Sequence, residues 1–154
     1  MKTSIRKALC ISIFILTGTS YADECSSACQ LEQIKTYFSF MDAINRKGAK
    51  PADIDGLLEN LHDEVTYEHV KFGVKFGKNK WKSNANNRIN KGFNTNDPND
   101  KISILNSIYG HNYVAIEFAH GYIDSKGVWN IKSDSQLGLF KFKDGKIVLI
   151  QELW

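Results

Sequence analysis

The chain has 154 residues, of which 42% are hydrophobic and 24% charged. This composition fits one ordinary globular domain and excludes a disordered or fibrous chain. The formal net charge is +3, but three of the 20 basic residues lie in residues 1–22, which contain no acid, so the remainder has 17 basic and 17 acidic residues. A nucleic-acid-binding protein normally has a clear basic excess, and we therefore expect no nucleic-acid partner.

Residues 1–22 have the pattern of a secretory signal peptide. A basic start precedes an apolar run, residues 8–17, that is too short to cross a membrane, and residues 20–22 (Ser-Tyr-Ala) provide a small-x-small cleavage site. Leu9 precedes Cys10, where a lipoprotein would have a small residue. We predict an exported protein, periplasmic or secreted, with no stable membrane insertion after the segment is removed.

Cys25 and Cys29 lie in an N-terminal segment, residues 23–30, that precedes the main domain. In an exported protein a disulfide is the default expectation. Their helical spacing would put the two Cα atoms about 6 Å apart, toward the upper end of the usable range. So small a loop would stabilise little through chain entropy. A redox-active pair is the alternative, although the spacing is not C-x-x-C.

Two helices are expected next, over residues 31–47 and from Asp53 to Leu61. Apolar residues recur at helical spacing in both, and Asp53 is a plausible N-cap. The first stripe consists of Ile34, Tyr37, Phe38, Met41 and Ile44. Tyr37 has a polar tip and could therefore reach into a cavity.

A short strand is expected over residues 65–70, where the hydrophobic period changes to two. Val65, Tyr67 and His69 then point to one side. His69 stands at the end of this strand beside a glycine-containing turn. Imidazole titrates near neutrality, so His69 is a candidate general acid or base, with a structural histidine as the alternative.

Residues 71–92 contain seven Lys or Arg and no acid. Trp81, Ala85 and Ile89 indicate a helix within this segment. A basic run with an aromatic residue can contact an anionic surface such as lipid headgroups. The simpler interpretation, which we favour, is a solvated helix face balanced by the acids of residues 59–68.

Residues 94–100 are expected to form a loop, followed by strands over 102–107, 113–123, 128–142 and 146–154. Val114, Ile116, Phe118 and His120 share one face of their strand. Counting back in twos from Phe142 places Phe140, Gly138, Gln136 and Asp134 on one face. The element order predicts an α+β fold, in which a curved antiparallel sheet wraps around the N-terminal helices to form a cone with a pocket.

Three segments resemble the nuclear-transport-factor-2-like or SnoaL-like superfamily, whose domain is such a cone. They are LLENLHDEVTYEH (57–69), FKFKDGKI (140–147) and the closing IQELW (150–154). The resemblance covers residues 31–154 and implies the fold, which hosts many chemistries. Members commonly dimerise through the sheet. A homodimer is therefore expected, through the face that carries Tyr113, Ala115, Leu137 and Leu139.

The ketosteroid isomerases of this superfamily permit a comparison by residue. His69 falls where those enzymes carry their general-base Asp, and Trp154 falls on a pocket tryptophan. Gly138 stands in place of the oxyanion-hole carboxylic acid, and Tyr37 is the nearest candidate for the oxyanion-hole tyrosine. Because this electrophilic pair is incomplete, we do not expect a steroid isomerase.

His69 is thus the candidate base, and Glu152 beside it would orient the imidazole. The candidate ligand-binding residues are Tyr37, Met41, Tyr67, Ile116, Phe118, His120, Asp134, Gln136, Phe140, Glu152 and Trp154. No motif with metal-ligand spacing or a cofactor fingerprint occurs, so we predict no metal and no cofactor.

Two functions remain open. The first is a domain that binds a small apolar ligand in its cone, without an assignable reaction. The alternative is a small isomerase, cyclase or dehydratase that uses His69 as general acid or base on a carbonyl compound. A second polar group within hydrogen-bonding distance of His69 would favour the enzyme.

Overall fold

The computed structural model describes residues 25–154, so the predicted signal peptide lies outside the described part of the chain. The helices are α1 (Ser27–Asn45), α2 (Pro51–Glu59) and α3 (Lys78–Asn90). The strands are β1 (Leu61–His69), β2 (Val74–Gly77), β3 (Asp100–Gly110), β4 (Tyr113–Ile123), β5 (Trp129–Ile131), β6 (Gln136–Lys143) and β7 (Lys146–Glu152). No helix among residues 25–154 is long and apolar enough to span a membrane.

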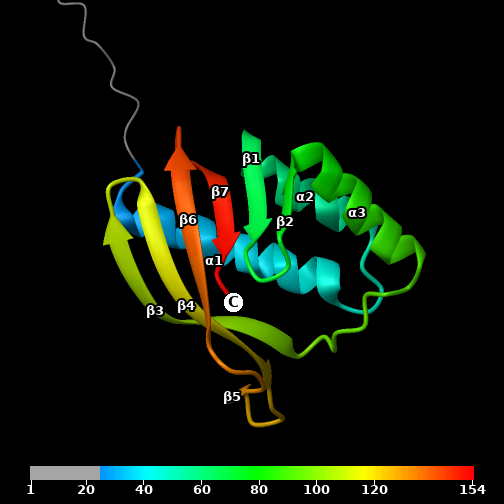
Figure 1. Cartoon of the computed structure of the whole chain (residues 1–154). Coiled ribbons are helices and arrows are strands. Elements are labelled where there is room, and N and C mark those ends of the chain that lie inside the picture. The colour runs from blue at the N-terminus through cyan, green and yellow to red at the C-terminus, as the bar shows by residue number, and fades with distance from the viewer. Residues whose placement is uncertain (1–24) are drawn as a thin grey trace, which may run out of the picture.

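The strands form one curved sheet in the order β2-β1-β7-β6-β4-β3, with β5 paired to β4. In Figure 1, α1 crosses behind the sheet, and α2 and α3 lie beside its β1–β2 end. This arrangement confirms the predicted α+β fold. The sheet is mixed, however, because β1 pairs with β7 in parallel while the other neighbouring strands are antiparallel.

The helix starts follow from their caps. α1 begins at Ser27, before the predicted residue 31, because the Ser26 hydroxyl accepts a hydrogen bond from the Cys29 N–H at 3.3 Å. Cys25 and Cys29 form a disulfide across this cap, with a Cα–Cα distance of 5.3 Å. α2 begins at Pro51, and Asp53 accepts the Lys50 N–H at 2.8 Å from inside the first turn, so Asp53 is not the N-cap residue.

The strands differ from the predicted ones at two places: one strand was not expected, and one expected strand is divided. The segment Val74–Gly77 forms β2 and pairs with the end of β1, although its sequence gives only a short alternation. The expected strand 128–142 is divided into β5 and β6. Between them, the Ser133 hydroxyl accepts the His120 N–H at 3.1 Å, and the Lys132 N–H donates to the His120 carbonyl at 2.8 Å. A side chain therefore replaces a backbone partner there, and the ladder is interrupted.

The core lies between α1 and the concave side of the sheet. Aromatic rings meet there: the centroids of Phe38 and Phe118 are 5.0 Å apart, and those of Tyr37 and Phe140 are 5.6 Å apart. These three phenylalanines, Tyr37 and Ile116 are buried in one cluster. The predicted pocket residues Tyr37, Ile116, Phe118 and Phe140 are therefore core residues, because an inward-facing strand position near the middle of the sheet is covered by α1.

Gly121 is required where β5 packs on β4. A Cβ atom at this position would lie 2.5 Å from the Trp129 ring and would clash with the Asn130 carbonyl oxygen, which belongs to the backbone. We expect Gly121→Ala to lower the free energy of unfolding by about 2–3 kcal/mol through overpacking. Urea denaturation measures this change.

Gly110→Ala is the matched control, because the nearest atom to its Cβ would be 3.7 Å away. Equal stability of the two variants would contradict the steric explanation.

Candidate functional site

A cavity of about 310 Å³ opens between the β1–β2 hairpin, α3 and the C-terminal part of α1. Its lining consists of Met41, Asn45, Tyr67, His69, Phe72, Val74, Phe76, Trp81, Asn84, Ala85, Arg88 and Asn94. The volume is at the lower end of the range for small-molecule sites. Of the residues predicted from the sequence, Met41, Tyr67 and His69 line this cavity.

Aromatic rings form one wall of the cavity. The β1–β2 register places Tyr67 opposite Phe76, and their rings stack with centroids 4.9 Å apart. Trp81, from the first turns of α3, packs against both rings at 5.2 Å and 5.9 Å. A flat apolar molecule would therefore contact aromatic faces on this side.

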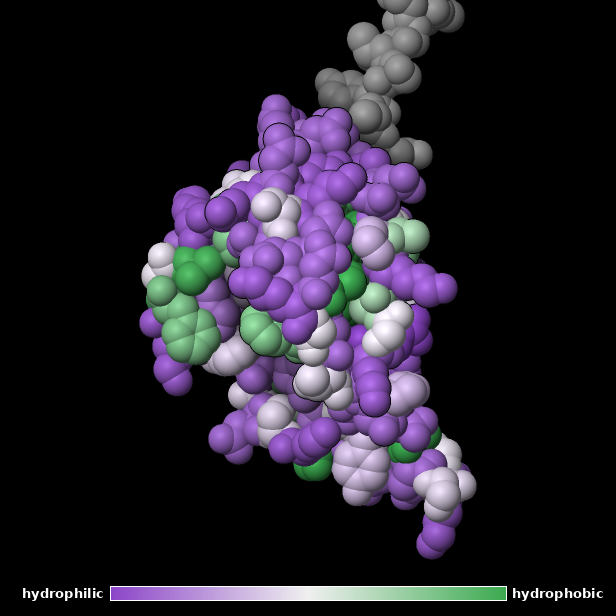
Figure 2. Space-filling model, turned by 90° about the vertical axis from the view of Figure 1, so that its right-hand side faces the viewer, coloured by the Kyte–Doolittle hydropathy of each residue, from purple (hydrophilic) through white to green (hydrophobic). Residues whose placement is uncertain are grey.

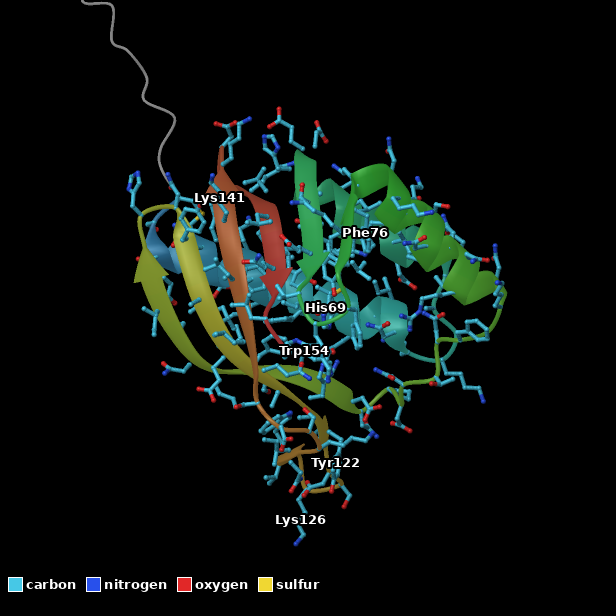
Figure 3. The ribbon with its side chains drawn as sticks, viewed as in Figure 1. His69, Phe76, Tyr122, Lys126, Lys141 and Trp154 are labelled. Carbon is cyan, nitrogen blue, oxygen red and sulfur yellow. A yellow bond between two sulfur atoms is a disulfide. The ribbon has the colours of Figure 1, made fainter. Side chains whose placement is uncertain are left out.

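His69 ends β1 and is held between two other rings. Its ring centroid is 4.4 Å from that of Phe72 and 4.5 Å from that of Trp154. Figure 3 shows His69 and Trp154 close together, with Phe76 nearer to α3. His69 is 6% exposed, and neither of its ring nitrogens has a hydrogen-bond partner among the described residues.

Glu152 reaches the site through the parallel pairing of β1 and β7, which places it opposite His69. The Tyr67 hydroxyl donates a hydrogen bond of 2.7 Å to Glu152 Oε2, and His69 Nε2 lies 3.8 Å from the same oxygen. Burial raises the pKa of Glu152, and the Tyr67 hydrogen bond and the charge of His69 oppose that rise. Burial and the neighbouring carboxylate also raise the pKa of Tyr67, whose proton stays in this bond.

Two lining residues have buried side-chain atoms with no hydrogen-bond partner among residues 25–154: His69, through both ring nitrogens, and Asn94, through Oδ1. A neutral imidazole has one donor and one acceptor nitrogen, and a buried polar group without a partner costs free energy. The Tyr67 hydroxyl is already committed to Glu152. A ligand that reached His69 with a hydroxyl or carbonyl group would satisfy a buried group that has no partner among the described residues.

Trp154 and Glu152 touch lining residues without lining the cavity themselves, whereas three other predicted residues lie elsewhere. His120 lines a separate, polar cavity, and burial lowers its pKa. Gln136 stands at the start of β6 and pairs with Phe118. Asp134 is exposed in the break between β5 and β6. Counting in twos along one long strand fails at that break, so Asp134 is not a pocket residue.

Most of the α3 side of the cavity was not predicted from the sequence. Trp81, Ala85 and Arg88 recur at helical spacing and all line the cavity, which was a usable signal. Phe76 was missed together with its strand. Among the described residues, no cluster of three or more His, Cys, Asp or Glu side chains could hold a metal ion.

Asp42 is a half-buried titratable group that no pattern in the sequence indicated. It lies on α1 in the polar cavity of His120, and its carboxylate accepts the Ile102 N–H at 3.1 Å. Burial raises the pKa of Asp42 to about 6, although the Ile102 hydrogen bond and the nearby Lys101 oppose the rise.

No protein-family model matches the chain, and no curated protein matches its sequence. Solved structures are similar in fold. A cystatin-fold protein from Novosphingobium aromaticivorans has a TM-score of 0.54 and 14% identity, over 80% of this chain and 97% of the other. An NTF2-like protein from Cytophaga hutchinsonii scores 0.51 at 14% identity, over 81% and 95%. An LEH-like epoxide hydrolase from M. tuberculosis has a TM-score of 0.52 at 15% identity, over 81% of each chain.

We expect Asp42→Asn to change how stability depends on pH. Because the folded state raises the pKa of Asp42 from 3.8 to about 6, the folded protein holds this proton more tightly than the unfolded chain. The free energy of unfolding should therefore fall as the pH rises through this window. Allowing for partial exposure, Asp42→Asn should be more stable than wild type by about 1–2 kcal/mol near neutrality, and equal to it near pH 4.

Urea denaturation at a series of pH values measures this difference. Asp134→Asn is the control, since Asp134 is exposed. If the wild-type and Asp42→Asn curves stay parallel across the series, burial of Asp42 does not have the proposed effect.

Proposed function

We propose that this protein, which has the nuclear-transport-factor-2-like, ketosteroid isomerase-like fold, binds a small, mainly apolar ligand in the cavity beside His69. The observation that carries the proposal is a buried imidazole with two unpartnered nitrogens in a wall of aromatic rings. Aromatic faces supply contact area, and one polar position supplies orientation, as is typical of small-molecule sites.

The charges around the cavity favour a neutral ligand. Arg88 lines the cavity, so a cation would be repelled there. Glu152 lies behind His69 with its side chain 13% exposed, so an anion at the base of the cavity would face a carboxylate. A ring compound or short chain with one hydroxyl or carbonyl group fits both constraints.

The catalytic alternative has less support. A proton-transfer enzyme would need a second polar group within hydrogen-bonding distance of His69. The nearest carboxylate oxygen, from Glu152, is 3.8 Å from Nε2 and already accepts the Tyr67 proton. Ligand binding needs no such partner, and the geometry therefore supports a binding protein better than an isomerase or dehydratase.

Filling the cavity should weaken binding. We expect Ala85→Trp, which places a large ring into the cavity, to weaken binding of the apolar dye phenylnaphthylamine at least tenfold, or about 1.4 kcal/mol. Asn87→Trp is the matched control, because Asn87 is exposed on the same helix and does not line the cavity. Dye fluorescence measures the affinity.

The role of His69 is tested with a pair of ligands. Wild type should bind naphthol about three- to tenfold more tightly than naphthalene, since one hydrogen bond contributes about 0.5–1.5 kcal/mol. His69→Phe keeps a ring but removes both nitrogens, and it should lose this preference. If Ala85→Trp leaves dye binding unchanged, the ligand does not bind in this cavity. If His69→Phe still prefers naphthol to naphthalene, only the proposed role of His69 is refuted.

We also propose that two copies associate through the outer face of the sheet. Large side chains exposed there include Leu105, Ile108, Tyr113 and Leu137, which are 37–69% exposed. Apolar groups grouped on one sheet face are typical of a self-complementary interface.

Leu137→Glu should convert a dimer into a monomer, because it places a charge in this face. Light scattering measures the mass. Val128→Glu is the control, since Val128 is 55% exposed at the β4–β5 turn, away from this face. A wild-type protein of monomer mass would contradict the proposal.

A further inference from the structure

Exposed apolar side chains gather around the mouth of the cavity. The β1–β2 hairpin carries Val70, Phe72 and Val74, which are 49%, 64% and 39% exposed. Beside it lie Leu153 and Trp154, because the Val70 N–H donates to the Glu152 carbonyl at 2.9 Å and Trp154 packs on His69. Single exposed hydrophobic residues are normal, but several of them on two neighbouring segments next to one cavity indicate an interaction surface. We call these five residues the apolar rim.

Phe93 extends this surface on the other side of the mouth. It is 62% exposed and precedes Asn94, which lines the cavity. Figure 2, which faces α3, shows hydrophobic atoms in separate groups on a surface that is otherwise mostly hydrophilic. The exposed apolar side chains around the mouth thus lie next to α3, whose surface is mostly polar.

The basic side chains next to these aromatic residues lack acidic partners. Lys75, Lys78 and Lys82 form ion pairs with Glu68, Asp63 and Asp55. By contrast, Lys71, Lys80, Arg88 and Lys91 have no carboxylate within 4.0 Å among residues 25–154. Among residues 25–154, only three of the seven Lys and Arg side chains in segment 71–92 therefore form an ion pair.

Cations and aromatic rings are neighbours on both sides of the mouth. Lys71 Nζ lies 5.9 Å from the centroid of the Phe72 ring, and Lys91 stands two residues before Phe93. Arg88 lines the cavity between them. Exposed aromatic residues beside Lys and Arg are typical of segments that lie in a membrane interface, where the rings enter the headgroup region and the cations contact anionic lipids.

We propose that the apolar rim and these cations dock the protein on the surface of an anionic phospholipid bilayer, with the mouth of the cavity facing the lipid. The charges are complementary, because the cations are unpaired and the bilayer is negative. This inference goes beyond the proposed ligand binding and does not depend on it. An apolar ligand could then pass between bilayer and cavity with little exposure to water.

The test uses the protein beginning after Ala22, because the apolar segment before it would itself bind lipid. The protein is sedimented with vesicles of phosphatidylcholine alone and with vesicles that also contain phosphatidylglycerol. We expect binding to the mixed vesicles, little binding to the neutral ones, and weaker binding as salt is raised. The double variant Lys71→Glu/Lys91→Glu should lower the partition coefficient between water and the mixed vesicles about tenfold or more. Phe72→Ser should also lower it.

Two controls have matched chemistry. Lys126→Glu reverses an exposed charge at the β4–β5 turn, which Figure 3 shows well separated from His69 and Trp154. Val128→Ser removes an apolar side chain that is 55% exposed at the same turn, away from both the rim and the outer face of the sheet. Both variants should bind as wild type does, and circular dichroism checks that each variant is folded.

Three outcomes would overturn the inference: no binding to the mixed vesicles, equal binding to both kinds of vesicle, or binding that the Lys71 and Lys91 substitutions leave unchanged. A dimer in solution that dissociates in Phe72→Ser would also overturn it, since a second copy would then cover the rim. The vesicles contain no ligand. A negative vesicle result therefore does not affect the test of ligand binding with the dye. A negative dye result likewise does not affect the test of membrane docking.

Discussion

The carboxylate of Glu152 is the constraint around which the cavity is built. A charged group removed from water is costly unless other groups compensate it. The Tyr67 hydroxyl supplies the compensation at 2.7 Å, and the imidazole of His69 stands 3.8 Å away. These contacts fix the orientation of Tyr67, which in turn supports the stacked rings of Phe76 and Trp81. The aromatic wall therefore depends on a polar interaction behind it.

The same interaction explains why the His69 nitrogens have no hydrogen-bond partner among the described residues. Tyr67 occupies the carboxylate, so the imidazole does not receive the short hydrogen bond that would orient a catalytic base. The rings of Phe72 and Trp154 hold His69 by packing instead. A histidine held in this way has two buried nitrogens and no proton-relay partner among the described residues, which fits a binding site better than a catalytic one.

Local patterns in the sequence predicted the fold well because they are strong in this chain. The apolar stripe of α1, the alternation from Val65 to His69 and the Asp144-Gly145 turn each have one plausible structure. Prediction of the site was weaker, because the site depends on pairings that no local pattern encodes. Glu152 meets Tyr67 only through the parallel β1–β7 pair. Phe118 and Phe140 are core residues because alternation gives the face of a strand but not how far along it α1 covers that face. Asp134 is exposed because the strand assumed in counting is broken between β5 and β6.

The parallel pairing of β1 and β7 has a consequence for folding. The contact between Tyr67 and Glu152 joins residues 85 positions apart in the chain, so closing it requires a large loss of chain entropy. Any conformation in which these two strands have not met lacks the polar base of the cavity, whatever helices it contains. Occupancy of the cavity would therefore report the complete fold, and a bound ligand would stabilise only that state, by mass action.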